Sequence, residues 1–277
     1  MMMMMTTRTS RDGTPSTLDE LRKNLERLKL RAMAHQLDEA LERASQLEQG
    51  YIAFLAGLVE REVLSRLDSS TRRRMAMARF PATKTFDTFD WAFQKGLNVQ
   101  LVKDLANLQF IDQKRPVLLL GKPGTGKSHI STAYGILAAQ RGYTVRFYKA
   151  AQLLGDLYAS LADSTTERLI SNLARIDLLI IDDMRHVPVR PEHATLLFDL
   201  IEARHLRKST MVSSNLSVKA WGEILGNPAL VASLVDRLME RAHVINIRRG
   251  RSYRAEGPDA PPESERPAVE PDDAPAS

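Results

Sequence analysis

A chain of 277 residues, of which 43% are hydrophobic, can bury the core of one sizeable domain and a smaller one, which excludes a protein disordered as a whole. The absence of cysteine excludes disulfides, cysteine-ligated zinc and cysteine nucleophiles. No stretch approaches the roughly 20 apolar residues that cross a bilayer, and the N-terminus lacks the order of a signal peptide. We therefore expect a soluble, cytoplasmic protein.

The formal net charge of +5 is unevenly distributed along the chain. Residues 255–277 contain seven acidic side chains against Arg266 alone, which gives this tail a net charge of −6 and leaves +11 on residues 1–254. A basic folded part favours an anionic partner. The tail is rich in proline, alanine and acid, so we expect it to be disordered, as we do residues 1–16.

Two helical runs follow. The first covers residues 16–49 and begins with Thr17 and Glu20 at capping-box spacing, after which leucines recur at helical intervals. The second covers residues 51–80 and ends at Pro81. We predict a helical N-terminal domain over residues 17–80. Residues 81–96 contain few aliphatic residues and several aromatic ones, and we interpret them as a hinge.

From residue 97 onward, short apolar segments alternate with helical ones. This alternation predicts an α/β fold over residues 97–254, a parallel sheet with helices on both faces. The expected strands are 115–120, 143–150, 177–182, 209–215 and 243–249, and the expected helices are 127–142, 150–163, 165–176, 191–208, 219–226 and 228–242.

The segment "GKPGTGKS" matches the pattern G-x-x-x-x-G-K-[ST] between an expected strand and an expected helix. Glycines allow consecutive backbone N–H groups to point at phosphate oxygens, and the helix N-terminus adds partial positive charge. We expect ATP with Mg²⁺, and the alternative is a plain glycine turn before a helix. The predicted nucleotide-binding residues are Gly121, Lys122, Pro123, Gly124, Thr125, Gly126, Lys127, Ser128 and His129, in which Lys127 reaches the β- and γ-phosphates and Ser128 binds the metal.

Two aspartates end the apolar segment "LLIIDD". Ligands bind at the carboxyl ends of strands in open α/β sheets, so we assign Asp182 to the Mg²⁺ shell and Asp183 to the attacking water. In isolation such aspartates more often form a turn. The expected strand 143–150 lies between the loop and the aspartates along the chain. This order indicates the branch of ATPases in which an extra strand separates the phosphate loop from the aspartates. It argues against a small-molecule kinase, because most of these lack that strand.

Two further residues are candidates for catalysis. Asn215 ends an expected strand, where its amide could help to position the water; the alternative is an asparagine in a strand-exit turn. Arg237, in "LVDRLMERA", could be an arginine finger supplied to a neighbouring subunit, and the alternative is an arginine on a solvated helix face. The six histidines show no close metal-ligand spacing, and we expect His129 to pack behind the loop.

The segment "TRRRMAMAR" is the most concentrated basic stretch. Its arginines could neutralise DNA phosphates, although a charge run is usually a solvated face. No major-groove motif is apparent, so sequence-specific reading is not supported. The candidate DNA-binding residues are Arg72, Arg73, Arg74 and Arg79.

With these motifs in place, residues 17–254 resemble the IstB-like ATP-binding proteins. These are helper subunits encoded beside the transposase in one class of bacterial insertion sequence, and they are related to the DnaC-type helicase loaders and DnaA-type initiators of the AAA+ ATPases. Beyond the phosphate loop, the resemblance rests on the segments "FPATKTFDTFD", "LLIIDDM", "STMVSSNLSVKAWGEILGNPALVASLVDRL" and "INIRRGRSYR".

The resemblance implies an ATPase that oligomerises on duplex DNA, deforms it and recruits or activates the transposase of the same element. It supports the roles given to Lys127, Ser128, Asp182, Asp183 and Asn215, the trans finger at Arg237 and DNA contacts in the N-terminal helices. The alternative is a DnaC-type adaptor that loads a helicase in DNA replication.

The chain departs from the family pattern in three places. Lys122 stands where proline is common, "MRHV" follows the aspartates where an aliphatic residue and glycine are usual, and the acidic tail is atypical. About 28 residues follow the last expected strand. We expect these to leave no room for a helical lid, so that a neighbouring subunit closes over the nucleotide.

Overall fold

The computed structural model describes residues 17–184, 191–225, 227–247 and 250–256. The chain divides into two compact units, Met1–Ser70 and Thr71–Ser277. No helix in the described ranges is both long enough and apolar enough to cross a membrane.

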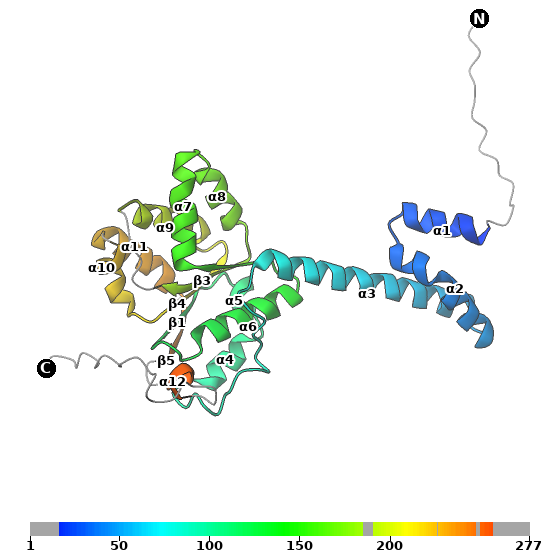
Figure 1. The fold of residues 1–277 in the computed structure, drawn as a ribbon, viewed down its shortest axis with the longest axis horizontal. Helices are drawn as coiled ribbons and strands as arrows, with labels where there is room; N and C mark the ends of the chain where they lie inside the picture. The colour runs from blue at the N-terminus through cyan, green and yellow to red at the C-terminus, as the bar shows by residue number, and fades with distance from the viewer. Residues whose placement is uncertain (1–16, 185–190, 226, 248–249, 257–277) are drawn as a thin grey trace, which may run out of the picture. The chain divides into compact units, whose positions relative to one another are not determined.

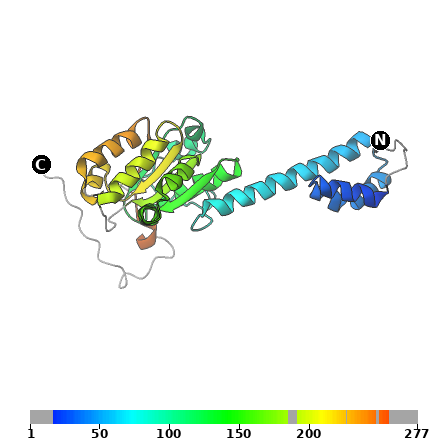
Figure 2. The same cartoon turned by 90° about the horizontal axis from the view of Figure 1, so that it is seen from above.

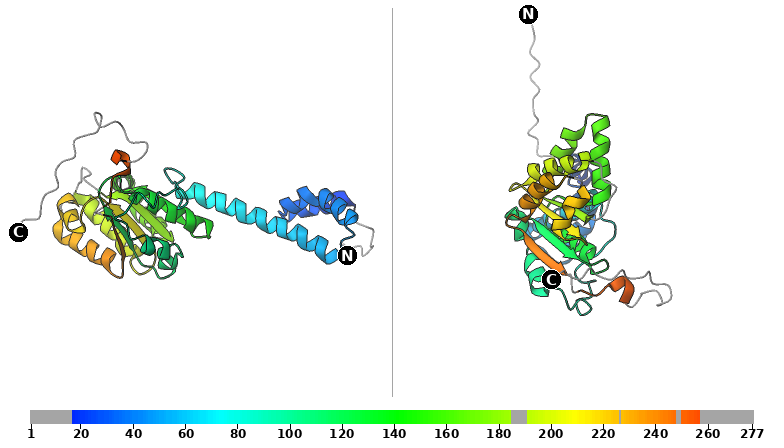
Figure 3. Two further views of the ribbon diagram at one scale, coloured as in Figure 1. Left: turned by 90° about the horizontal axis from the view of Figure 1, so that it is seen from below. Right: turned by 90° about the vertical axis from the view of Figure 1, so that its left-hand side faces the viewer.

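The first unit is helical, as expected, but the run predicted over residues 16–49 forms two helices rather than one. These are α1 (Leu18–Arg27) and α2 (Arg31–Gln46), which pack on α3 (Tyr51–Ala78), the helix that continues into the second unit (Figure 3). Thr17 caps α1 by accepting the N–H of Glu20 at 3.4 Å. The buried core of the first unit contains Leu25, Met33, Ala34, Leu37 and Leu58.

A tertiary contact explains the break between α1 and α2. Lys29 takes a left-handed conformation with φ 58°, which ends the first helix. The new N-terminus at α2 has no side-chain cap of its own. Instead the buried carboxylate of Glu62 on α3 accepts the N–H groups of Ala32 and Met33 at 2.8 and 3.2 Å. Because these N–H groups are paired by a residue far away in the chain, the periodicity of the sequence gives no sign of the break between the two helices.

The second unit contains the predicted parallel sheet, with strand order β2-β3-β4-β1-β5. Figure 1 labels β3, β4, β1 and β5 in this order. All five expected strands are confirmed. Their bounds are β1 (Val117–Gly121), β2 (Val145–Lys149), β3 (Leu178–Met184), β4 (Ser209–Ser214) and β5 (His243–Ile247). The strand that separates β1 from β3 in space is β4, whereas β2, to which the sequence argument pointed, forms the edge next to β3.

Helices cover both faces of this sheet (Figure 2). One face packs against α6 (Lys127–Gln140) together with α4 (Val99–Leu105) and α5 (Gln109–Asp112), two short helices that the sequence analysis did not predict. The other face packs against α7 (Ala150–Ala162), α9 (Pro191–Arg204), α10 (Trp221–Leu225) and α11 (Pro228–Met239). Beside them lie α8 (Thr166–Ala174) and the short helix η1 (Val218–Ala220), and the described chain ends in α12 (Tyr253–Glu256).

The segment 81–96, which we expected to be a hinge, belongs to the second unit and packs closely on it. Phe89 is only 7% exposed. The ring of Phe86 lies edge-on to Tyr134 of α6 with centroids 4.8 Å apart, and the indole of Trp91 donates to the carbonyl of Phe86 at 3.2 Å. The boundary between the two units lies after Ser70, within α3, whereas we expected it at residue 80.

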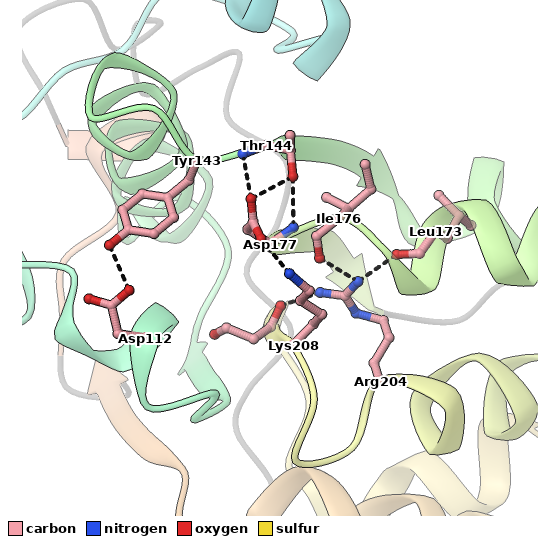
Figure 4. Close-up of polar contacts among 9 residues, drawn as sticks. Asp112, Tyr143, Thr144, Leu173, Ile176, Asp177, Arg204 and Lys208 are labelled. Carbon is pink, nitrogen blue, oxygen red and sulfur yellow. Dashed lines mark hydrogen bonds and ion pairs between the residues drawn. The ribbon is translucent and has the colours of Figure 1, made fainter.

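A polar network joins the segments that lead into the strands (Figure 4). The guanidinium of Arg204, 1% exposed, donates to the carbonyls of Leu173 and Ile176, the latter at 2.8 Å. Burial lowers the pKa of Arg204 to about 9, so the side chain remains charged at neutral pH. Asp177 accepts from the Thr144 hydroxyl and from Lys208, at 2.7 and 2.6 Å. These bonds fix the amino ends of the strands and so the register of their carboxyl ends.

Candidate nucleotide-binding site

The phosphate loop connects the end of β1 to the start of α6, as the motif requires. Gly126 has φ 92° as the N-cap of α6, and a Cβ there would stand 2.7 Å from the ring of Phe89. Both the backbone conformation and the aromatic ring therefore require glycine. The segment 81–96 thus supports the loop from behind. Lys122 and Pro123 are exposed at the tip of the loop.

Lys127 is 8% exposed, and its amine lies within the curve of the loop. Its Nζ donates to the carbonyls of Gly121 and Lys122 at 2.7 and 2.8 Å. The hydroxyl of Thr125 donates to the carbonyl of Lys122 at 2.8 Å. The loop thus surrounds a buried ammonium group, which is the arrangement that would neutralise phosphate oxygens.

The two predicted metal ligands meet at the sheet edge. The hydroxyl of Ser128, at the start of α6, donates to Oδ1 of Asp182 at 3.0 Å. Asp182 is 4% exposed near the end of β3. A hydroxyl and a buried carboxylate oxygen beside a phosphate loop are oxygen donors of the kind that Mg²⁺ accepts. These residues therefore fit the metal, which would be held jointly with the phosphates.

Ser213 is a residue that the sequence analysis missed. Its hydroxyl, on β4, donates to Oδ1 of Asp182 and accepts the N–H of Asp183, the latter at 3.0 Å. It therefore orients both carboxylate-bearing residues from the neighbouring strand. Two consecutive serines at the end of an apolar strand, "MVSSN", are the signal that could have identified it.

Asp183 leaves the regular path of β3. Its φ is 62°, and the register of β3 on β4 shifts between Ile181 and Met184. Aspartate tolerates this left-handed conformation better than most residues. The bulge separates the setting of Asp183, which is half-buried, from that of buried Asp182. Of the departure noted in "MRHV", Met184 is buried in the core, and residues 185–187 lie outside the described residues.

Asn215 directly follows β4, whose Ser214 is aligned with Leu120 of β1 and Met184 of β3. It therefore lies at the same edge as the phosphate loop. Its Oδ1 is buried and has no hydrogen-bond partner among the described residues. A buried acceptor left unpaired is costly, which favours a ligand-directed role over a simple turn.

Arg237 does not approach the loop of its own chain. Its guanidinium pairs with Glu202 of α9, donates to the hydroxyl of Ser233 at 2.7 Å and lies over the ring of Phe198 with its carbon 4.8 Å from the centroid. Arg237 lines a small hollow together with Pro116 and Thr210, which lie at the amino ends of β1 and β4. A finger at this position could act only on another copy.

His129 joins α6 to the segment 81–96. Its Nε2 lies 2.8 Å from the carbonyl of Thr85, and its ring is edge-on to Phe89 with centroids 5.1 Å apart. Burial lowers the pKa of His129 below its usual value, and nearby Lys84 acts in the same direction. The neutral imidazole is therefore a packing group behind the loop.

The four candidate DNA-binding arginines do not form one equivalent set. Arg72, Arg73 and Arg79 are exposed, whereas Arg74 is partly buried and its Nε donates to the carbonyl of Ala139 at the end of α6, at 2.9 Å. All four lie in the second unit, after Ser70, and not in the helical first unit.

Comparison with known proteins identifies the family. Residues 23–258 match the family model described as IstB-like ATP binding protein. The insertion sequence IS21 ATP-binding protein of Pseudomonas aeruginosa is 33% identical over 237 residues, which cover 86% of this chain and 89% of that protein. A relative from insertion sequence IS232 of Bacillus thuringiensis subsp. berliner is 33% identical over 239 residues, or 86% of this chain and 95% of that protein.

The fold is similar to that of DnaI. The crystal structure of DnaI superposes with a TM-score of 0.52 at 17% identity and covers 62% of this chain and 93% of that one. Together, the matching model, the insertion-sequence relatives and the phosphate loop at the end of β1 show that this chain belongs to the IstB-like ATP-binding proteins.

Proposed function

We propose that this protein is an ATP-dependent, DNA-binding helper of transposition, which oligomerises on duplex DNA, recruits or activates the transposase of the same element, and hydrolyses ATP with Mg²⁺. The observation that carries the proposal is the convergence of Lys127, Ser128 and Asp182 at the carboxyl edge of the sheet in a chain whose relatives belong to insertion sequences. The buried ammonium, the hydroxyl and the carboxylate are suited to phosphate and metal.

The chain's own residues divide the work. Loop N–H groups and Lys127 bind the β- and γ-phosphates, and Ser128 with Asp182 holds the magnesium ion, which supplies charge neutralisation when bound. Asp183 orients or deprotonates the attacking water, and Asn215 offers its unpaired amide oxygen on the same edge. Arg237 would complete the site of an adjacent copy.

The first test replaces the loop lysine. Lys127→Ala should abolish ATP turnover and the ATP-dependent filaments or rings on DNA, because the only buried ammonium in the loop is lost. Lys103→Ala is the matched control, since Lys103 is exposed on α4 and does not line the hollow beside Arg237. Phosphate release and electron microscopy of the DNA complexes measure the two properties. Retained ATPase activity in the Lys127 variant would exclude this site.

The second test concerns DNA. Each lost phosphate contact should flatten the dependence of log K on log[salt] by about 0.9. We expect this for alanine variants of the exposed Arg72, Arg73 and Arg79, but not for Arg74, whose Nε is bonded to Ala139. Unchanged slopes in all four variants would move the DNA surface elsewhere.

The third test concerns Arg237. Mixing Arg237→Ala subunits with Asp183→Asn subunits should partly restore ATPase activity, because one interface of the mixed assembly then has an intact finger facing an intact aspartate. No recovery at any ratio would leave Arg237 with only its contacts to Glu202, Ser233 and Phe198 of the same chain.

The alternative of a helicase-loading adaptor differs in its partner and not in its nucleotide site. Pull-down of the full-length protein with the transposase of the same element, compared with a replicative helicase, separates the two. Capture of the helicase alone would favour the adaptor.

A further inference from the structure

The chain returns to the phosphate loop after β5. The backbone N–H of Tyr253 donates to the carbonyl of Gly124 at 3.0 Å. The hydroxyl of Ser252 occupies the place that a Cβ on residue 124 would take. We call residues 250–253 the C-terminal strap. It contacts the outer turn of the loop through both backbone and side chain.

The strap is anchored on its other side by residues that precede α4. Gln94, 3% exposed, donates through Nε2 to the carbonyl of Arg251 at 2.6 Å. The ring of Phe93 lies edge-on to that of Tyr253, with centroids 4.9 Å apart, and beneath the guanidinium of Arg251, also at 4.9 Å. Arg251 in turn pairs with Glu256 at 2.7 Å. These contacts hold the strap at a fixed place beside the loop.

Because a peptide group is planar, the bond from Tyr253 to the Gly124 carbonyl also sets the direction of the next N–H group in the loop. The carbonyl of Gly124 and the N–H of Thr125 belong to one trans peptide, in which they point in opposite directions. Because the carbonyl is held toward the strap by Tyr253, the N–H of Thr125 points away from the strap. A flip of this peptide changes ψ of Gly124 and φ of Thr125, and glycine, which has no Cβ, accepts the changed ψ at little cost.

We propose that the C-terminal strap is a positioning element of the nucleotide site, which holds the Gly124–Thr125 peptide with its N–H directed at the phosphates. This inference rests on the binding of ATP at the same loop. Tyr253 and Gln94 act through the loop backbone and do not touch the nucleotide. A loop in which this peptide flips would bind ATP only in the fraction of molecules with the correct orientation, which weakens the apparent affinity by that fraction.

The test compares two variants that differ in one hydrogen-bond donor. Tyr253→Ala and Tyr253→Pro both remove the ring, but only proline also removes the backbone N–H. Residue 253 is the first residue of α12, a position where proline fits helical geometry. One net hydrogen bond corresponds to a change in affinity of about fivefold. We expect the full-length Tyr253→Pro protein to bind an ATP analogue with Mg²⁺ more weakly than Tyr253→Ala in titration calorimetry, by up to about fivefold, and to keep a cooperative melting transition in the absence of nucleotide.

Equal affinities of these two variants, with normal binding by the wild type, would overturn the strap proposal and leave the nucleotide site intact. Failure of the wild type itself to bind would instead overturn the proposed function. If the proline variant does not fold, Gln94→Met, which removes the donor to Arg251, provides the second test. Its control is Gln100→Met on the exposed side of α4, where the amide donates to Asp104. Gln94→Met should weaken ATP binding and Gln100→Met should not; equal binding by both counts against the strap.

Discussion

Asp182 illustrates how single residues determine the site. Hydroxyls on two neighbouring elements, Ser128 of α6 and Ser213 of β4, both donate to its Oδ1. Ser213 additionally accepts the N–H of Asp183 at 3.0 Å, where the strand bulges. A carboxylate held in this way keeps one orientation for a metal ion.

The first residue-scale prediction follows from this arrangement. Ser213→Ala should raise the Mg²⁺ concentration needed for half-maximal ATP binding by about tenfold or more, because residues that orient a ligand contribute this much to metal affinity. Magnesium titrations at fixed ATP concentration measure the effect. Ser209→Ala on the opposite end of β4 is the control, since its hydroxyl bonds the carbonyl of Arg115. An unchanged Mg²⁺ requirement would show that Ser213 does not orient Asp182.

The second residue-scale prediction concerns the stability of the loop. Gly124→Ala should lower the free energy of unfolding by at least about 1 kcal/mol, because an alanine at φ 79° is strained and its Cβ meets Ser252. The double variant with Ser252→Gly should recover part of the loss by removing the collision. Urea unfolding of the four proteins gives the coupling energy. Strict additivity would mean that Ser252 does not crowd residue 124.

At the scale of elements, the end of α3, which belongs to the second unit, is held there by two arginines that each take part in a bond to a carbonyl at a helix C-terminus. Arg74 donates to Ala139 at the end of α6, and Arg146 on β2 donates to Met77 at the end of α3, both at 2.9 Å. The last carbonyls of a helix lack intrahelical partners and carry partial negative charge, so guanidinium groups stabilise them. The last turns of α3 are therefore held against α6 and β2 within the second unit.

We expect Arg74→Ala to destabilise the protein by about 1–2 kcal/mol, because a charged donor to a partly buried carbonyl is lost. Arg73→Ala, at an exposed position one residue away on the same helix, should change the free energy of unfolding by less than about 0.5 kcal/mol. Chemical denaturation followed by circular dichroism measures both. If the two variants are equally stable, the bond to Ala139 does not fasten the helix.

At the scale of the whole molecule, the titration of two histidines makes stability depend on pH. Burial lowers the pKa of His129 and of His243 below the ordinary value, aided by the nearby cations Lys84 and Arg115 respectively. The unfolded chain therefore binds protons that the folded chain does not. Their contribution is fully present above the unfolded pKa of about 6.5 and is lost as the pH falls from there through the folded pKa values.

We accordingly expect the free energy of unfolding to decrease between pH 7.5 and pH 5.5, where carboxylates have not yet begun to protonate appreciably. Urea denaturation at the two pH values gives the difference. A variant with His129→Gln and His243→Gln should show a smaller decrease. An identical decrease in that variant would assign the effect to other groups.

The local order of residues predicted much of this protein. The glycine turn between β1 and α6, the five strands and the position of Asp182 near the end of β3 were confirmed, because each depends on neighbours in the chain: a glycine turn, an apolar run, a polar residue at a strand end. The position of Lys127 could be predicted equally well, since the motif fixes its spacing from Gly121 along the chain. Ser213 could have been read from two hydroxyls in an apolar strand.

Other features depend on contacts between residues far apart in the chain. The helix that begins after the break at Lys29 is capped by the carboxylate of Glu62. The segment 81–96, which we expected to be a hinge, supports the loop because the ring of Phe89 lies against Gly126. In the sequence, Arg74 is one of four similar arginines. Only the structure shows that it differs from them, because its Nε donates to the carbonyl of Ala139. Composition and periodicity contain no information about such partners.

The sequence by itself determined that a triphosphate-binding loop is set in a parallel α/β sheet after a helical region, because the hydrophobic pattern and glycine spacing act over a few residues. Only the tertiary structure decided which strand separates the loop from Asp182, where the first unit ends, and that residues 250–253 reach back to Gly124. Burial and hydrogen bonding select these arrangements among the many that the same local pattern permits, and they do so only when the whole chain is packed.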